Sequence, residues 1–134
     1  MTIIKVHVTE GKRIDTAPTT GATVSLLMDG EVLGTTTYLT SLTCTLEPGS
    51  QIRPLHSHRD SDEISYVVSG KGRFWIEGET CEIGPGDLIL QPANSKHTVK
   101  NTGEVPLVLL CFHSSPNIRK KGRYIVYDNI EVNL

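Results

Sequence analysis

The sequence predicts a single all-β domain, a β-sandwich or barrel, and three observations support this. The 134 residues are enough for one domain with one buried core. Short segments that alternate apolar and polar residues, or that are rich in β-branched residues, recur along the chain between turn residues. Apolar residues with a helical period are missing, and 12 glycines and 7 prolines are more than a helical bundle carries.

The expected strands follow one another between turn signals. We expect them at 3–9, 23–28, 31–37, 38–47, 64–68, 73–77, 80–83, 88–91, 97–101, 107–113 and 124–127. Asp29-Gly30 predicts a hairpin turn between the second and third of these strands, and residues 12–21 are expected to form a loop. The continuous apolar run 107–113 predicts a strand that is buried on both faces.

The charge and the cysteines exclude several classes of protein. Thirteen basic and 15 acidic residues give a net charge of −2, so we expect neither nucleic acid nor an anionic membrane as a partner. The N-terminus lacks a signal-peptide run, and the longest apolar stretch, 107–112, is too short for a membrane helix. Three cysteines without C-x-x-C spacing indicate reduced thiols, and we therefore expect a cytoplasmic protein.

Three histidines and a glutamate suggest a metal site. His56 and His58 are two residues apart, so on a strand both imidazoles lie on one face. Glu63 opens the next strand, and His97 begins another after a proline-containing loop. Such a nitrogen–oxygen site suits Fe(II), Mn(II), Ni(II), Co(II), Cu(II) or Zn(II) rather than calcium or magnesium. A His-x-His pair taken alone is equally compatible with two surface histidines.

The residues around these four side chains resemble the two motifs of the cupin superfamily. The first motif corresponds to Gly49, His56-Ser57-His58, Glu63 and Gly70, and the second to Gly86, Pro92-Ala93-Asn94, His97 and Asn101. The resemblance covers about residues 40–113. Two positions depart from it: Gly49 lies one residue further from His56 than is common, and Asn94 stands where glycine is usual. Asparagine tolerates the left-handed region best among the other residues, so that turn is still expected.

The resemblance implies a fold, a ligand set and a partition of the chain. The fold would be a cupin-type double-stranded β-helix, which is a jelly-roll barrel in a single domain. The metal ligands would be His56, His58, Glu63 and His97, and two positions of a six-coordinate ion would stay open. We expect residues 1–37 to form N-terminal strands and a dimerisation arm, 38–115 the core barrel, and 116–134 a C-terminal extension.

Further residues are candidates for binding a substrate. Ser65 shares the face of Glu63 by alternation, Phe74 is a candidate for the wall, and Gln91 flanks the second motif. His113 ends the last apolar strand and could act as an acid or base at the rim, or simply be solvated. These side chains could equally just fill the barrel. The basic run 119–123 is either a solvated segment or a site for an anionic group or a partner chain.

The function implied by the resemblance is a metal-dependent enzyme acting on a small, oxygen-rich metabolite. The reaction would be of the isomerase, lyase, cyclase or decarboxylase type, or of the dioxygenase type, with Glu63 able to take a proton. The alternative is a sensor or binding module that holds a small ligand without turning it over. We also expect a homodimer, formed when the N-terminal residues pair with the sheet edge of a second subunit.

Overall fold

The computed structural model describes residues 2–15 and 19–134, and within these ranges it contains strands and no helix. The strands are β1 (Lys12–Ile14), β2 (Thr23–Met28), β3 (Thr40–Leu46), β4 (Leu55–His58), β5 (Glu63–Ser69), β6 (Gly72–Ile76), β7 (Glu79–Ile83), β8 (Leu88–Gln91), β9 (His97–Asn101), β10 (Leu107–His113) and β11 (Tyr124–Tyr127).

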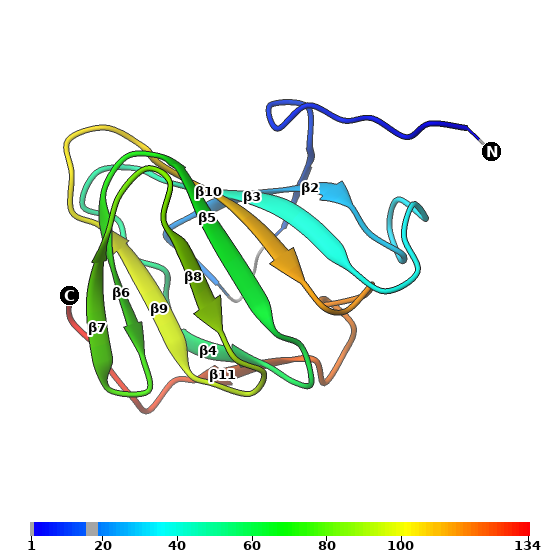
Figure 1. The fold of residues 1–134 in the computed structure, drawn as a ribbon. Helices are drawn as coiled ribbons and strands as arrows, with labels where there is room; N and C mark the ends of the chain where they lie inside the picture. Colours follow the sequence, from blue (N-terminus) through cyan, green and yellow to red (C-terminus); the bar gives the residue numbers. More distant parts are fainter. Residues whose placement is uncertain (1, 16–18) are drawn as a thin grey trace.

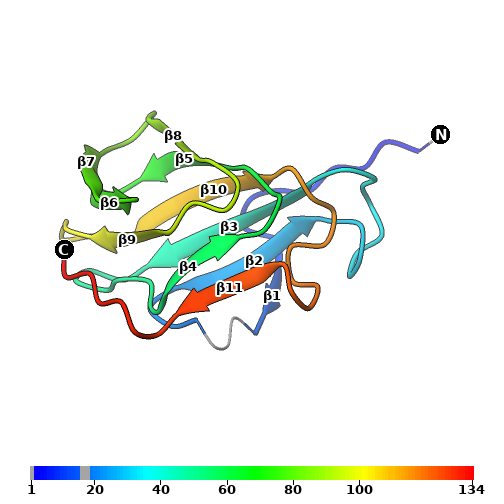
Figure 2. The ribbon, with the colours of Figure 1, turned by 90° about the horizontal axis from the view of Figure 1, so that it is seen from below.

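The strands form two antiparallel sheets, which Figure 1 shows as two layers. The larger sheet has the order β1-β2-β3-β10-β5-β8, and the smaller has the order β11-β4-β9-β6-β7. Strand β11 pairs with β4, and Figure 2, viewed from below, shows both strands in front of β2 of the larger sheet. This arrangement is a jelly-roll barrel, so the expected all-β fold and its architecture are confirmed.

The core lies between the two sheets and follows from the alternation of side chains along each strand. On β5, Glu63, Ser65 and Val67 point inward and are buried, while Ile64 and Tyr66 point outward and are exposed. Phe74 on β6 is 1% exposed and packs in the apolar core, as the alternation predicts. The inward-facing polar residues of β5 are therefore brought into the barrel by the same periodicity that buries its core.

The hairpin predicted at Asp29-Gly30 is wrong, because residues 31–37 form turns and bends rather than a strand. The buried carboxylate of Asp29 accepts hydrogen bonds from the backbone N–H groups of Val32 (3.0 Å) and Leu33 (2.7 Å). Its main-chain carbonyl accepts from the N–H groups of Thr35 (2.7 Å) and Thr36 (3.2 Å). These bonds replace the cross-strand ladder that a hairpin would need.

Three other expectations also need correction. Residues 3–9 form no strand, and β1 lies in the expected loop, where Lys12 pairs with Leu26 of β2. The strand β10 is buried on its inner face only, and Phe112 is 42% exposed. The reason is that the second sheet covers β10 from one side, so its outward-facing side chains remain at the surface.

The chain outside the expected core barrel continues the two sheets. Strands β1 and β2 extend the larger sheet, and β11 pairs with β4 at the edge of the smaller one. The partition at residues 37 and 115 stays a prediction.

The described residues contain no helix of a length and apolarity that would cross a membrane.

Candidate metal centre

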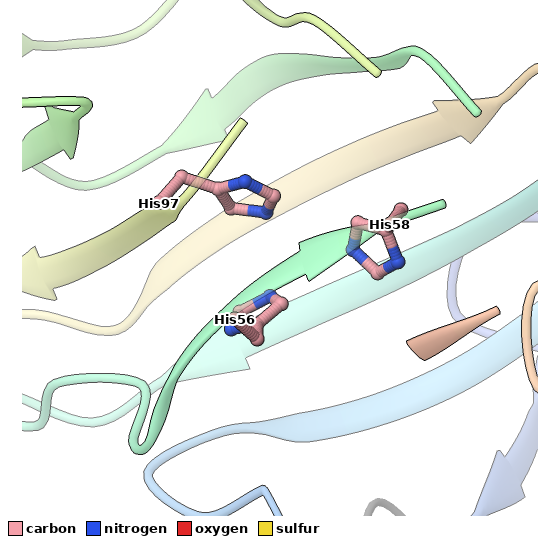
Figure 3. A group of neighbouring side chains, drawn as sticks. All are labelled: His56, His58 and His97. Carbon is pink, nitrogen blue, oxygen red and sulfur yellow. The ribbon is translucent and has the colours of Figure 1, made fainter. Parts of the chain in front are cut away.

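Three histidine rings meet on the inner face of the smaller sheet. His56 and His58 lie on the same face of β4, and His56 is paired in register with His97 at the start of β9. Figure 3 shows the three rings turned toward a common space. One ring nitrogen from each residue lies within 4.8 Å of the others, and all three side chains are buried. The predicted pair of histidines on one strand face is therefore a buried set rather than a surface pair.

Glu63 reaches the same space from the larger sheet. Its Oε1 atom lies 3.3 Å from Nε2 of His97 and 3.6 Å from Nε2 of His58. Its Oε2 atom lies 3.1 Å from Nε2 of His113, because β5 and β10 pair Glu63 directly with His113. We call these five residues, His56, His58, Glu63, His97 and His113, the histidine–glutamate cluster.

The loops that carry the cluster are braced against each other. Asn94 has a φ of 68°, the left-handed conformation expected for it, and its N–H donates to the carbonyl of His58 (2.9 Å). The Asn94 side-chain oxygen accepts from the N–H of Asp60 (3.1 Å), and the Asp62 carboxylate accepts from the N–H of Ala93 (2.8 Å). These bonds fix the loop before β9 to the loop between β4 and β5, so the ligand-bearing strand ends are held in one place.

Burial and charge shift the pKa values of His56, His58 and Glu63 toward the protonation states that a cation requires. Burial, and then the neighbouring His97 and His58, hold the pKa of His56 well below its usual value. Burial lowers the pKa of His58 to about 3, with further lowering by His113 and His97, although Glu63 opposes it. Burial alone would raise the pKa of Glu63, but contacts with His113, His97 and His58 hold it well below the usual range. Neutral imidazoles beside an ionised carboxylate are the forms that bind metal.

The hydrogen bonds of the rings are compatible with a cation between them. Nδ1 of His97 lies 3.0 Å from the carbonyl of Ser95, and Nδ1 of His56 lies 3.3 Å from the carbonyl of Pro54. If each Nδ1–H donates to its carbonyl, each Nε2 carries a lone pair. Nε2 of His97 is then a buried acceptor facing a carboxylate oxygen, and it has no hydrogen-bond partner among the described residues. Two acceptors at this distance repel unless a cation lies between them.

A cavity of about 410 Å³ leads to the cluster, and His56, His58, Glu63 and His113 line its inner end. Tyr124 of β11 also lines it and stacks on His56, with ring centroids 4.9 Å apart. Cys44 is in the wall, where burial, and then the Glu63 charge, raise the pKa of its thiol to about 12. A second cavity of about 500 Å³, under residues 128–132, is lined by none of the histidines.

The residues predicted to bind substrate are divided by the structure. His113 lines the cavity together with Glu63, the predicted metal ligand and proton acceptor, whereas Ser65, Phe74 and Gln91 are outside its lining, and their role stays a prediction. The Gln91 amide, turned so that its nitrogen faces two carbonyls, donates to Glu63 O (2.9 Å) and accepts from the Ser65 hydroxyl (2.9 Å). In this orientation it braces β5 behind the carboxylate of Glu63.

The sequence interpretation missed Tyr124 and placed His113 at the rim. Tyr124 lies in the last strand, and no motif marks it. His113 was considered as a rim residue, yet it is 2% exposed and contacts Glu63 directly. The inward periodicity of 107–113 was the available signal for His113, because it places this residue on the same face as Leu109 and Cys111.

The comparisons with known proteins agree with this geometry. The cupin domain family matches residues 42–113, which is more than half of the chain. The chain belongs to the cupin family. Among curated relatives, an uncharacterized protein of Methanocaldococcus jannaschii is 39% identical over 62 residues, or 46% of this chain and 50% of that protein. An oxalate-binding protein of Thermotoga maritima is 35% identical over 65 residues, or 48% of this chain and 53% of that protein.

Cupin enzymes are among the other relatives. An acireductone dioxygenase of Bacillus thuringiensis is 47% identical over 47 residues, or 31% of this chain and 27% of that protein. This cupin chain thus spans about half the length, or less, of the curated relatives that it matches.

Solved structures share the whole fold. A predicted oxalate decarboxylase of Thermotoga maritima superposes with a TM-score of 0.70 and 26% identity, covering 84% of this chain and 99% of that chain. Bacillus subtilis oxalate decarboxylase, whose structural description names Mn(II) centres, gives a TM-score of 0.70 and 26% identity, covering 89% of this chain and 30% of that chain.

Proposed function

We propose that this cupin binds one divalent transition metal ion through His56, His58, Glu63 and His97 and uses it to bind a small, oxygen-rich metabolite. The observation that carries the proposal is the convergence of three buried imidazoles with the Glu63 carboxylate, whose Oε1 lies 3.3 Å from Nε2 of His97. Nitrogen and carboxylate ligands suit manganese, iron, cobalt, nickel, copper or zinc. The Mn(II) centres of the Bacillus subtilis relative support this choice of metals.

We propose an enzyme rather than a passive binder. The bound ion would supply Lewis acidity to a substrate that chelates it through adjacent oxygens. Glu63 would accept a proton at its carboxylate, with His113 holding Oε2 at 3.1 Å. The reaction is then of the isomerase, lyase or decarboxylase type, or of the dioxygenase type, and the enzymes among the relatives support this class. The alternative is a module that holds its ligand unchanged, which the oxalate-binding relative supports.

Elemental analysis tests the metal site. The protein is purified without chelator, stripped, and reloaded with each candidate metal, and about one ion per chain is expected. His56→Ala and His97→Ala should each lose the ion. His7→Ala is the matched control, because His7 is exposed and lies outside the cluster. If the first two variants load as much metal as the control, the ligand assignment is wrong.

Product analysis with an oxygen electrode separates the two functions. The metal-loaded protein is incubated with oxalate, diketones and hydroxy acids. Oxygen consumption with product indicates a dioxygenase, and product without oxygen uptake indicates isomerase or lyase chemistry. Ligand that is retained and recovered unchanged, without product from any compound, supports the binding module.

We also propose a homodimer in the cytoplasm. Strand β1 is at the free edge of the larger sheet, where a second subunit could add a strand. The three thiols are unpaired, which favours a reducing compartment. Light scattering should give twice the monomer mass of 14.7 kDa, and a monomeric mass would rule the dimer out.

A further inference from the structure

The cavity above the histidine–glutamate cluster has a buried end and an exposed end. The cluster residues at its inner end are between 2% and 8% exposed. Arg119, Lys120 and Lys121, in the segment between β10 and β11, line the same cavity and are exposed. A ligand that reaches the cluster therefore passes these three cations, which we call the cationic rim.

The wall between the two ends is apolar. It includes Val24 of β2, Leu42 of β3, Ile118 and Val126 of β11. Leu42 and Ile118 are buried, and Val24 and Val126 are half-buried. An oxygen-rich anion without a carbon chain would leave this wall in contact with water. A ligand with methylene groups against the wall would gain about fourfold in affinity for each group that it buries.

The positive charge of the rim is not neutralised by ion pairs among the described residues. Arg119 donates to the main-chain carbonyl of Asp15 (2.6 Å). Lys120 and Lys121 take part in none of the ion pairs found among the described residues. Three cations and the one neighbouring carboxylate in the lining, that of Asp15, leave the rim positive. Such a mouth attracts anions and can pair with an anionic group on a ligand.

We propose that the ligand of this site is an elongated organic acid with two anionic ends. A chelating head of adjacent oxygens would bind at the histidine–glutamate cluster, a spacer of several carbons would lie against the apolar wall, and a second carboxylate or phosphate would bind at the cationic rim. The volume of about 410 Å³ is within the range of cavities that hold ligands of this size. The proposal rests on the proposed metal site and specifies its substrate class.

Calorimetric titration of the metal-loaded protein tests the spacer. The probes are pyruvate, 2-oxobutanoate, 2-oxopentanoate and 2-oxohexanoate, which keep the chelating head and lengthen the chain. Affinity should rise about fourfold with each methylene. Val126→Thr, which places a hydroxyl in the wall at nearly constant volume, should flatten this dependence, so that 2-oxohexanoate loses more affinity than pyruvate. Affinity independent of chain length, or oxalate binding more tightly than every member of the series, would overturn the proposal.

Comparison of 2-oxoadipate with 2-oxohexanoate tests the rim. The second carboxylate should increase affinity severalfold at low salt, and high salt should remove the gain. The double substitution Lys120→Gln and Lys121→Gln should abolish this gain, and 2-oxoadipate should lose more affinity than 2-oxohexanoate, which lacks the second carboxylate. Lys71→Gln, at an exposed lysine in the turn between β5 and β6, is the matched control. A gain that survives the double substitution refutes the role of the rim.

The same titrations distinguish failure of this inference from failure of the proposed function. Metal content is measured on every sample, and circular dichroism verifies the fold of each variant. A protein that binds metal but shows no dependence on chain length or rim charge refutes the ligand class and keeps the metal site. A protein that binds no metal but retains both dependences refutes the metal site and supports the wall and rim assignments.

Discussion

Truncation of the His97 side chain should remove most of the stabilisation that metal binding gives to the folded state. A ligand that binds only the folded state at 100 times its dissociation constant stabilises that state by about 2.7 kcal/mol. For a chain of this length, 1 kcal/mol corresponds to about 3–5 °C in Tm, so metal should raise the Tm of the parent protein by about 10 °C. His97 offers Nε2 3.3 Å from Glu63 and is one of four proposed ligands. Loss of His97 should therefore lower the metal affinity by more than the 10–100-fold that follows from loss of an outer hydrogen-bond partner of a metal ligand.

A loss of 100-fold at the same metal concentration would leave a stabilisation of about 0.4 kcal/mol, which is less than 2 °C. The measurement is differential scanning calorimetry of the parent and His97→Ala proteins, each with Mn(II) at 100 times the dissociation constant of the parent and each with chelator. The chelator-treated pair corrects for the cavity that truncation of a buried ring creates. A variant whose Tm still rises by about 10 °C on adding metal would show that His97 is not a ligand.

Two further predictions follow from the pKa values and from burial. Burial lowers the pKa of His58 to about 3 and holds that of His56 well below 6.5, so the unfolded chain takes up protons first as pH falls. Urea unfolding in the presence of chelator should give the full free energy of unfolding above about pH 6.5. Below that pH, each of the two histidines should lower the free energy of unfolding by about 1.4 kcal/mol per pH unit. Equal free energies of unfolding at pH 7.5 and pH 5 would contradict this. In a thiol-reagent assay of the native protein, exposed Cys81 should react at once and buried Cys44 and Cys111 only after unfolding, because burial raises the pKa of both. Rapid reaction of all three thiols would contradict the buried positions.

The local periodicity of the sequence predicts part of the site. Strand geometry alone places His56 and His58 on one face, since side chains alternate along a strand. Contacts between residues on strands that are distant in the sequence cannot be predicted in this way, because they depend on long-range strand pairing. The register that sets His113 opposite Glu63 joins strands more than forty residues apart, and no local pattern reports it. The resemblance to cupins supplied Glu63 and His97 as ligands but assigned no contact to His113.

The failed hairpin at Asp29 has a different cause. A turn dipeptide between two apolar segments is a local signal, and here a buried carboxylate provides a competing set of local hydrogen bonds. Strand 31–37 would have required pairing partners that the sheet does not offer, because β2 already pairs with β1 and β3. Local turn propensity was therefore overridden by side-chain bonding and by the saturation of the neighbouring strand.

The origin of the cavity residues explains why family membership alone does not define the substrate. The matched family segment ends at His113 and contributes seven lining residues, among them the cluster residues at the inner end. Twelve lining residues come from outside that segment, including Val24, Ile118 and the cationic rim. In the proposed function the family segment would supply the metal ligands, and the flanking segments would set the length, polarity and charge of the ligand that reaches them. Under this proposal, two cupins with identical clusters would take different acids if their flanking segments differed, so the titrations of chain length and rim charge, rather than metal content, test which acid this chain takes.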